Sequence, residues 1–106
     1  MPYTIDFEPD AWQDLKVLRK GEQVKILKAI ETHLSHDPTR QSKSRIKQLR
    51  PGSQPPYRLR VDEFRIFYDV ENKEQLVVIY GVVHKDYALD WLADFARKTA
   101  GKEDHL

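Results

Sequence analysis

Residues 57–70 read YRLRVDEFRIFYDV, two runs of alternating apolar and polar residues that meet at Asp62-Glu63. Alternation with a period of two is the pattern of a half-buried strand, and a two-residue loop is the shortest common connection between antiparallel strands. We therefore predict a hairpin in which Arg60 lies opposite Arg65. One face belongs to the core and the other is polar, with Tyr57, Leu59, Val61, Phe64, Ile66 and Tyr68 on the core face and Arg58, Arg60, Arg65 and Phe67 on the other.

The arginine pair is not one that stability alone would favour, since like charges directly opposite each other weaken a sheet by roughly 0.2–1 kcal/mol. An anionic ligand between the arginines would explain the pair. Two alternatives stay open. Asp-Glu is not the Asn-Gly or Asp-Gly of a type I′ turn, so the register can slip or contain a bulge. The arginines can also be paired with Asp69, Glu71 or helix carboxylates, in which case their role is structural.

The periodicity on either side of the hairpin predicts an α+β fold. An N-terminal strand and a helical hairpin joined at Gly21 pack on a small twisted antiparallel sheet, and a short C-terminal helix follows. We expect a strand at 3–8, a helix at 10–20 capped by Asp10, a helix at 22–35, a basic loop at 38–56, strands at 57–61, 64–70 and 75–83, and a helix at 84–98. The expected apolar stripes are Val24, Leu27, Ile30 and Leu34 on the second helix and Leu89, Leu92 and Phe95 on the last.

The chain has 106 residues, of which 40% are hydrophobic and 33% charged, and it contains no cysteine. This length fits one domain at 1–98 followed by a polar tail at 99–106. The lack of cysteine excludes a disulfide framework, a thiolate nucleophile and a thiolate metal site. The N-terminus does not resemble a signal peptide, and the apolar stretch at 76–83 is too short to span a bilayer. We expect a soluble, cytoplasmic protein.

The net charge of +1 hides a separation of charge along the chain. Residues 40–65 carry eight basic side chains against Asp62 and Glu63, whereas the rest of the chain carries ten basic and fifteen acidic side chains. A charged run is often only a solvated face. Separation of the two signs is nevertheless the electrostatic pattern of a protein that binds a polyanion.

The hairpin sequence, together with a strand ending Tyr80-Gly-Val-Val-His84-Lys85, resembles the pattern yRlR-x-x-x-yRi-x-Y … v-x-HR of the RelE/ParE superfamily of toxins. The order of elements across nearly the whole chain is similar as well. The resemblance implies a type II toxin that a cognate antitoxin protein neutralises in a toxin-antitoxin hetero-oligomer. In the RelE branch, such a toxin enters the ribosomal A site and cleaves mRNA as a metal-independent endoribonuclease. The substrate's own 2′-hydroxyl attacks the adjacent phosphate.

The resemblance also implies roles for single residues. Arg65 falls on the family's arginine at the start of the third strand, which stabilises the transition state. Arg58 and Arg60 match basic positions on the second strand, as phosphate ligands or participants in proton transfer. Lys85 falls where the family usually has arginine, so it keeps the charge but loses the bidentate fork.

Aromatic and imidazole side chains complete the candidate site. Several relatives place a catalytic aromatic shortly after the basic residue, and of the candidates Tyr87 and Trp91 only Tyr87 can transfer a proton. Histidine titrates closest to neutral pH, which makes His84 a candidate acid or base, although a single histidine at a strand end is more often structural. His33 and His36 lack carboxylates in a metal-ligand spacing, and the chain has no glycine-rich phosphate loop, so we expect neither a metal nor a cofactor.

The basic loop offers further cations for RNA binding, and we expect them to contribute affinity more than rate. They are Lys43, Arg45, Lys47 and Arg50. Two other functions stay open: a ParE-like inhibitor of DNA gyrase, which keeps the fold without the cleavage residues, and an inactive relative that only binds its antitoxin. The near-neutral total charge and the lack of an arginine at position 85 leave room for a gyrase inhibitor, whereas the basic second strand, Arg65 and His84-Lys85 favour RNA cleavage.

Overall fold

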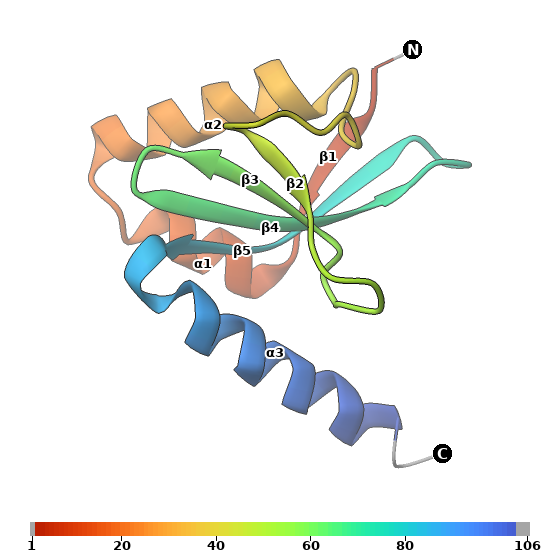
Figure 1. The fold of residues 1–106 in the computed structure, drawn as a ribbon. Coiled ribbons are helices and arrows are strands. Elements are labelled where there is room, and N and C mark those ends of the chain that lie inside the picture. The colour runs from red at the N-terminus through yellow and green to blue at the C-terminus, as the bar shows by residue number, and fades with distance from the viewer. Residues whose placement is uncertain (1, 104–106) are drawn as a thin grey trace.

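Five strands form one sheet in the computed structural model, which describes residues 2–103 (Figure 1). The strand order is β1-β5-β4-β3-β2, and β1 pairs parallel to β5 whereas the other neighbours pair antiparallel. The expected α+β fold is confirmed, with a sheet that is mixed because the chain between β1 and β5 forms a long crossover. The elements are β1 (Thr4–Phe7), α1 (Pro9–Lys16), α2 (Lys20–Leu34), β2 (Ile46–Gln48), β3 (Tyr57–Val61), β4 (Phe64–Glu71), β5 (Leu76–His84), the 3₁₀ turn η1 (Lys85–Tyr87) and α3 (Ala88–Glu103).

The β3–β4 hairpin has the predicted register, with Arg60 opposite Arg65. At the turn, Asp62 adopts a left-handed backbone conformation with φ 51°, which aspartate tolerates better than most residues that carry a side chain. This explains how an Asp-Glu loop closes the hairpin without a slip in register. A shift in pairing occurs instead on the other side of β4, where its ladder with β5 is irregular between Phe67 and Tyr68.

The apolar face of the hairpin packs against α1 and α2 and forms the core. On α2 the buried stripe is Ile26, Ile30 and Leu34, so the predicted stripe was wrong in its first half: Val24 is 57% exposed and Leu27 39%. Two apolar stripes overlap on this helix, and the one spaced by four residues faces the sheet. The buried core is Ala11, Leu15, Ile26, Ile30, Leu34, Ile46, Leu59, Val61, Ile66, Tyr68, Val77, Ile79 and Val82.

The start of α1 differs from the prediction. The helix begins at Pro9 with Glu8 as its N-cap, and no side chain makes a capping hydrogen bond. Asp10 was predicted as the cap and lies instead in the first turn. Proline is favoured at the first helical position, because its missing amide hydrogen would have no partner there.

The start of α2 differs as well. It begins at Lys20, so Gly21 lies within its first turn and does not join the two helices as predicted. The connection is held by the side-chain amide of Gln23, which donates to the carbonyl oxygens of Leu18 at 2.8 Å and Lys16 at 3.1 Å. These two hydrogen bonds satisfy carbonyl groups at the end of α1 and just beyond it, and they stabilise a tight turn without glycine.

The segment predicted as a basic loop contains a short strand, β2, at the edge of the sheet. Lys47 of β2 lies opposite Arg58 of β3. The start of the segment is tied to the core by the hydroxyl of Tyr68, which donates to the carbonyl oxygen of Pro38 at 2.6 Å. The basic segment is therefore anchored at both of these points.

α3 runs to Glu103 and so extends into 99–106, the segment expected to be a polar tail, of which 104–106 lie outside the described residues. Figure 1 shows α3 leaving the end of β5 and running away from the sheet. Its first turns pack through Trp91 and Phe95, whereas Leu89, expected in the apolar stripe, is 82% exposed. No helix within residues 2–103 is long and apolar enough to cross a membrane.

Candidate functional site

Three arginines gather on the face of the sheet opposite α1 and α2. Arg60 and Arg65 are direct cross-strand neighbours, and Arg58 lies two residues before Arg60 on β3. Burial, Arg65 and Arg60, in that order, lower the pKa of Arg58, and burial followed by Arg60 lowers the pKa of Arg65. Each of these directions means that the charged form is disfavoured where it stands. We call these three residues the arginine cluster.

No carboxylate among the described side chains forms an ion pair with the arginine cluster. The alternative in which Asp69, Glu71 or a helix carboxylate neutralises the arginines therefore finds no support among these residues. The Nε atom of Arg58 is in addition buried without a hydrogen-bond partner. A buried donor without an acceptor costs about 1–3 kcal/mol. An anion with several acceptor oxygens would relieve both the repulsion and this unsatisfied donor.

Arg65 is held in place by the hairpin turn. One terminal nitrogen of its guanidinium donates to the carbonyl oxygens of Asp62 and Phe64, both at 3.0 Å. The carbonyl groups fix the direction of the side chain without neutralising its charge. A cation that is oriented before the ligand arrives needs little reorganisation when charge develops nearby.

Glu63 gathers the basic groups at the end of β5, a contact that the sequence did not predict. Its carboxylate lies 3.6 Å from Nζ of Lys85 and 3.5 Å from Nε2 of His84. The backbone amide of Lys85 also donates to the carbonyl oxygen of Glu63 at 2.7 Å. Lys85 and His84 thus lie beside the hairpin turn that precedes Arg65, and the carboxylate of Glu63 contacts both of them.

The hydrogen bonds of His84 limit what its imidazole can do. Nδ1 accepts a hydrogen bond of 3.1 Å from the backbone amide of Asp86, which places His84 at the N-cap of η1. In the neutral ring the proton then lies on Nε2, on the side of Glu63. In this arrangement His84 can donate a proton from Nε2, while the lone pair on Nδ1 is occupied by the capping hydrogen bond.

The two aromatic candidates on the C-terminal side differ in what they contact. The Trp91 ring stacks between Phe67 at 4.8 Å and Phe95 at 5.1 Å. A Cβ atom at position 81 would come within 2.4 Å of the Trp91 ring, so Gly81 makes this close packing possible. Tyr87 is 65% exposed, beside His84. Trp91 therefore fastens α3 to the sheet, and Tyr87 is the aromatic side chain that can meet a ligand.

The four loop cations do not form one surface. Lys47 lies opposite Arg58, next to the arginine cluster. Arg45 lines hollows beside α2 instead, together with His33. Lys43 and Arg50 are exposed elsewhere in the irregular segment.

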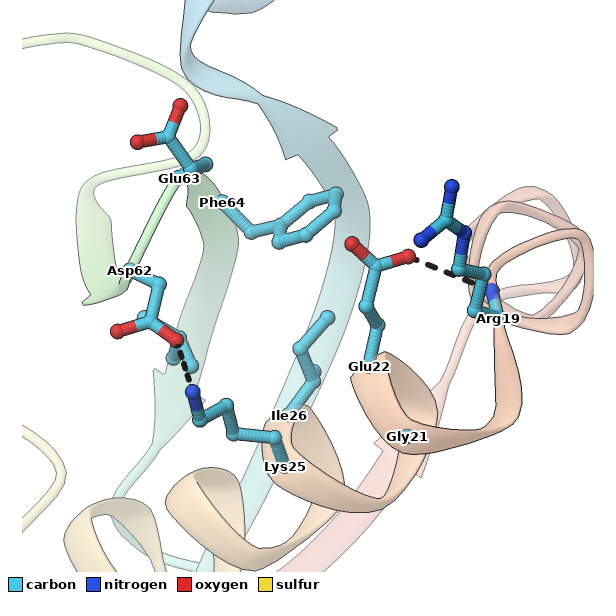
Figure 2. Close-up of a pocket in the computed structure, with 9 residues that line it drawn as sticks. Arg19, Gly21, Glu22, Lys25, Ile26, Asp62, Glu63 and Phe64 are labelled. Carbon is cyan, nitrogen blue, oxygen red and sulfur yellow. Dashed lines mark hydrogen bonds and ion pairs between the residues drawn. The ribbon is translucent and has the colours of Figure 1, made fainter.

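A cleft of about 400 Å³ lies on the α2 side of the hairpin turn (Figure 2). No residue of the arginine cluster lines it. Lys25 of α2 and Asp62 of the turn close one side of it through an ion pair of 2.6 Å. The hydrogen bond to Lys25 is the main reason that the pKa of Asp62 is lowered. The cleft is lined by Arg19, Gly21, Glu22, Lys25, Ile26, Val61, Asp62, Glu63 and Phe64.

Comparison with protein families gives one match. Residues 5–88 match the family of ParE toxins of type II toxin-antitoxin systems, parDE. This range contains α1, α2, the arginine cluster and all of the sheet except Thr4, the first residue of β1. No curated protein matches the chain.

Solved structures with the same fold include several toxins. The chain is similar to a protein in the RelBE toxin-antitoxin complex of Mycobacterium tuberculosis, with 28% identity, a TM-score of 0.67, and coverage of 79% of this chain and 92% of that chain. In the archaeal RelE-RelB complex of Pyrococcus horikoshii the match has 21% identity, a TM-score of 0.65, and coverage of 80% and 97%. The isolated RelE toxin of E. coli matches with 18% identity, a TM-score of 0.59, and coverage of 77% and 83%.

Proposed function

The chain belongs to the ParE toxin family of type II toxin-antitoxin systems, within the RelE/ParE superfamily, and from this premise we propose that it is a ribosome-dependent mRNA endoribonuclease that inhibits translation. The arginine cluster is the observation that carries the proposal. Three guanidinium groups without carboxylate partners among the described side chains suit a phosphodiester. Arginine binds phosphate oxygens through two parallel hydrogen bonds.

In the proposed chemistry the nucleophile is the RNA's own 2′-hydroxyl. It gives its proton to solvent water as it attacks the adjacent phosphorus, the 5′-oxygen leaves with a proton from the toxin, and a cyclic phosphate remains on the upstream fragment. Negative charge is greatest on the pentavalent phosphate. The two hydrogen bonds that fix the direction of Arg65 support a role for this residue in stabilising that charge. Arg58 and Arg60 bind the same phosphate. In other enzymes, loss of one such preorganised donor slows the reaction by about 10²–10³.

Proton transfer is assigned to groups near the hairpin turn. The leaving 5′-oxygen must be protonated, and His84 carries a donor on Nε2 in its capped arrangement. The hydroxyl of Tyr87 is the second candidate, because this side chain is exposed beside His84. Lys85 adds positive charge once phosphate competes with Glu63 for it.

The structures of related toxins in complex with antitoxins support a proposed antitoxin partner for this chain as well. We propose that the antitoxin covers the arginine cluster and supplies the anionic groups that the toxin itself does not place there. Such a complex neutralises the like charges that the free toxin leaves unpaired. It also blocks the surface that would bind RNA.

A second candidate function is inhibition of DNA gyrase. Two observations favour it: the matching family is that of the ParE toxins, and Lys85 pairs with Glu63 where the RNA-cleaving branch usually has arginine. This function would keep the fold and use its surface for binding alone.

One pair of assays separates these functions. Purified toxin is added to ribosomes carrying a defined mRNA, and the fragments are mapped by primer extension. The same preparation is tested for inhibition of DNA supercoiling by gyrase. We expect cleavage that requires ribosomes and no effect on gyrase. Inhibition of gyrase without RNA cleavage would replace the proposal with the second function, and inactivity in both assays despite antitoxin binding would indicate an inactive relative.

A further inference from the structure

Two adjoining hollows lie between α2 and the edge of the sheet, on the α2 side of the sheet rather than on the side of the arginine cluster. Their volumes are about 370 and 260 Å³, and both are lined by Thr32, His33 and Arg45. Because they share these residues, they form one continuous depression. We call it the α2–β2 groove and define it by Lys25, Lys28, Thr32, His33, Arg40 and Arg45.

The α2–β2 groove carries an excess of positive charge. Of the two carboxylates that border it, Asp62 is already paired with Lys25 at 2.6 Å, and Asp37 is the other. Lys28, Arg40 and Arg45 form no ion pair with any carboxylate in the described part of the chain. Burial, and then the charge of Arg45, lower the pKa of His33, so the guanidinium of Arg45 acts across the groove.

The polar groups in the groove are mainly hydrogen-bond donors. Guanidinium, ammonium and imidazole groups stand beside the hydroxyl groups of Thr32 and Ser44. Apolar side chains offer little contact surface to a ligand, since Ile46 and Val61, which line the groove, are almost wholly buried. A peptide that docks tightly normally places apolar anchors in a pocket, whereas a nucleic-acid backbone needs donors and positive charge. These features favour an RNA backbone over an acidic peptide.

We propose that the α2–β2 groove is a second binding site for RNA phosphates, separate from the arginine cluster. Lys28 and His33 are five residues apart on α2, which is about 7.5 Å along the helix axis, so the groove is long enough for two neighbouring phosphates of one strand. It ends at β2, where Lys47 lies opposite Arg58 of the arginine cluster. An RNA strand in the groove can therefore cross the sheet edge toward the cleavage site. The inference rests on the proposed function only in taking RNA as the ligand.

The test uses binding alone, so it does not depend on cleavage. The full-length toxin is titrated with a fluorescent single-stranded RNA whose 2′-hydroxyls are methylated, at several salt concentrations. The variant Lys28→Ala/Arg40→Ala removes two groove cations, and Lys16→Ala/Lys98→Ala is the control with the same change in charge. Each phosphate contact on a single strand contributes about 0.7 to the slope of log affinity against log salt. We expect the groove variant to lower this slope by about 1.4 and the control to leave it unchanged.

The outcomes separate the two proposals. An unchanged slope in the groove variant, with normal wild-type binding and cleavage, would overturn the groove and leave the proposed function intact. Absence of RNA binding by wild-type toxin would overturn the groove alone, because the proposed cleavage takes place on ribosomes and is decided by the ribosome assay. If the groove variant instead loses affinity for its antitoxin while its RNA slope is normal, the groove is a protein site and the proposal is wrong. Restoration of the slope by Lys28→Arg/Arg40→Lys, with unchanged thermal unfolding, would attribute the effect to charge.

Discussion

The two faces of the β3–β4 hairpin belong to the same strands but carry opposite kinds of side chain, apolar on one face and charged on the other. On the core face, Leu59 and Ile66 lie opposite each other and are wholly buried. On the open face, Arg60 and Arg65 form the next pair, and no described carboxylate neutralises them. Burial of apolar area explains the first pair, whereas repulsion makes the second unfavourable for folding. A surface that folding does not explain is therefore the one to assign to a ligand.

The largest expected effect belongs to the core face. Leu59→Ala removes a fully buried side chain and leaves a cavity, so we expect the free energy of unfolding to fall by about 2–5 kcal/mol. Urea unfolding measures this loss. Leu27→Ala is the matched control on the exposed side of α2, with an expected change within about 0.5 kcal/mol. Equal losses in the two variants would show that the core face is not packed as described.

On the open face, Arg65→Ala should affect chemistry rather than folding. We expect single-turnover cleavage on programmed ribosomes to slow by roughly 10²-fold or more, which is about 3 kcal/mol of transition-state stabilisation. Ribosome binding should stay within about one order of magnitude, because the charge on the phosphate is smaller in the ground state. Arg97→Ala, an exposed change on α3 beside Asp94, is the control.

The stability of Arg65→Ala decides how its loss of activity is interpreted. The variant loses two hydrogen bonds to turn carbonyls but also loses a repulsive pair, so the free energy of unfolding should change by less than about 1 kcal/mol. Cleavage by Arg65→Ala at nearly the wild-type rate would contradict the proposal that the arginine cluster catalyses RNA cleavage. An unfolded variant would mean that Arg65 is a structural residue. Arg65→Lys, which keeps the charge and loses the two-pronged guanidinium, would then be the variant to assay for cleavage.

The sequence predicted the hairpin well because its information is local. Alternation and a two-residue loop determine which residue faces which, and the register at Arg60 and Arg65 is as predicted. The start of α2 was harder to predict from the sequence. Glycine usually disfavours a helix, but Gly21 lies in the first turn of α2. The choice between Val24 and Ile26 for the core depends on how the helix is rotated against the sheet, which no periodicity within the helix determines.

The parts of the candidate site that the sequence could not predict depend on contacts between distant segments. Glu63 was treated only as a turn residue, yet it lies beside Lys85 and His84 because β4 and β5 pair there. Arg45 was grouped with the loop cations, and its position against α2 follows from the path of an irregular segment. Residue type and spacing carry no signal for either contact.

Tyr68 links the core face to the basic segment, and its loss should have an intermediate effect. Tyr68→Phe leaves the buried carbonyl oxygen of Pro38 without its donor, which should lower the free energy of unfolding by about 1–3 kcal/mol. Burial, and then the neighbouring Tyr57, raise the pKa of Tyr68 from its ordinary value of 10.0. The unfolded chain therefore releases this proton at lower pH than the folded protein does.

The sign of the pH effect follows from linkage. Neutral Tyr68 contributes its full stabilisation below pH 10.0, the ordinary pKa of tyrosine. This stabilisation is lost as the pH rises from that value toward the raised pKa of Tyr68 in the folded protein. Unfolding free energies measured across this range should fall less steeply for Tyr68→Phe than for the wild type. Parallel curves would mean that Tyr68 ionises as easily in the folded protein as in the unfolded chain.

The smallest effect is a gain in stability on the open face. Arg60 is exposed and lies opposite Arg65, so Arg60→Gln removes a like-charge pair while keeping a long polar side chain. We expect the free energy of unfolding to rise by roughly 0.2–1 kcal/mol. Because surface charges are screened by salt, the gain should shrink as ionic strength increases. Lys16→Gln is the control for the loss of one positive charge outside the arginine cluster, and urea unfolding at low and high salt measures both variants. If Arg60→Gln is less stable than the wild type at low salt, the open face contributes to folding after all, and the contrast with the core face fails.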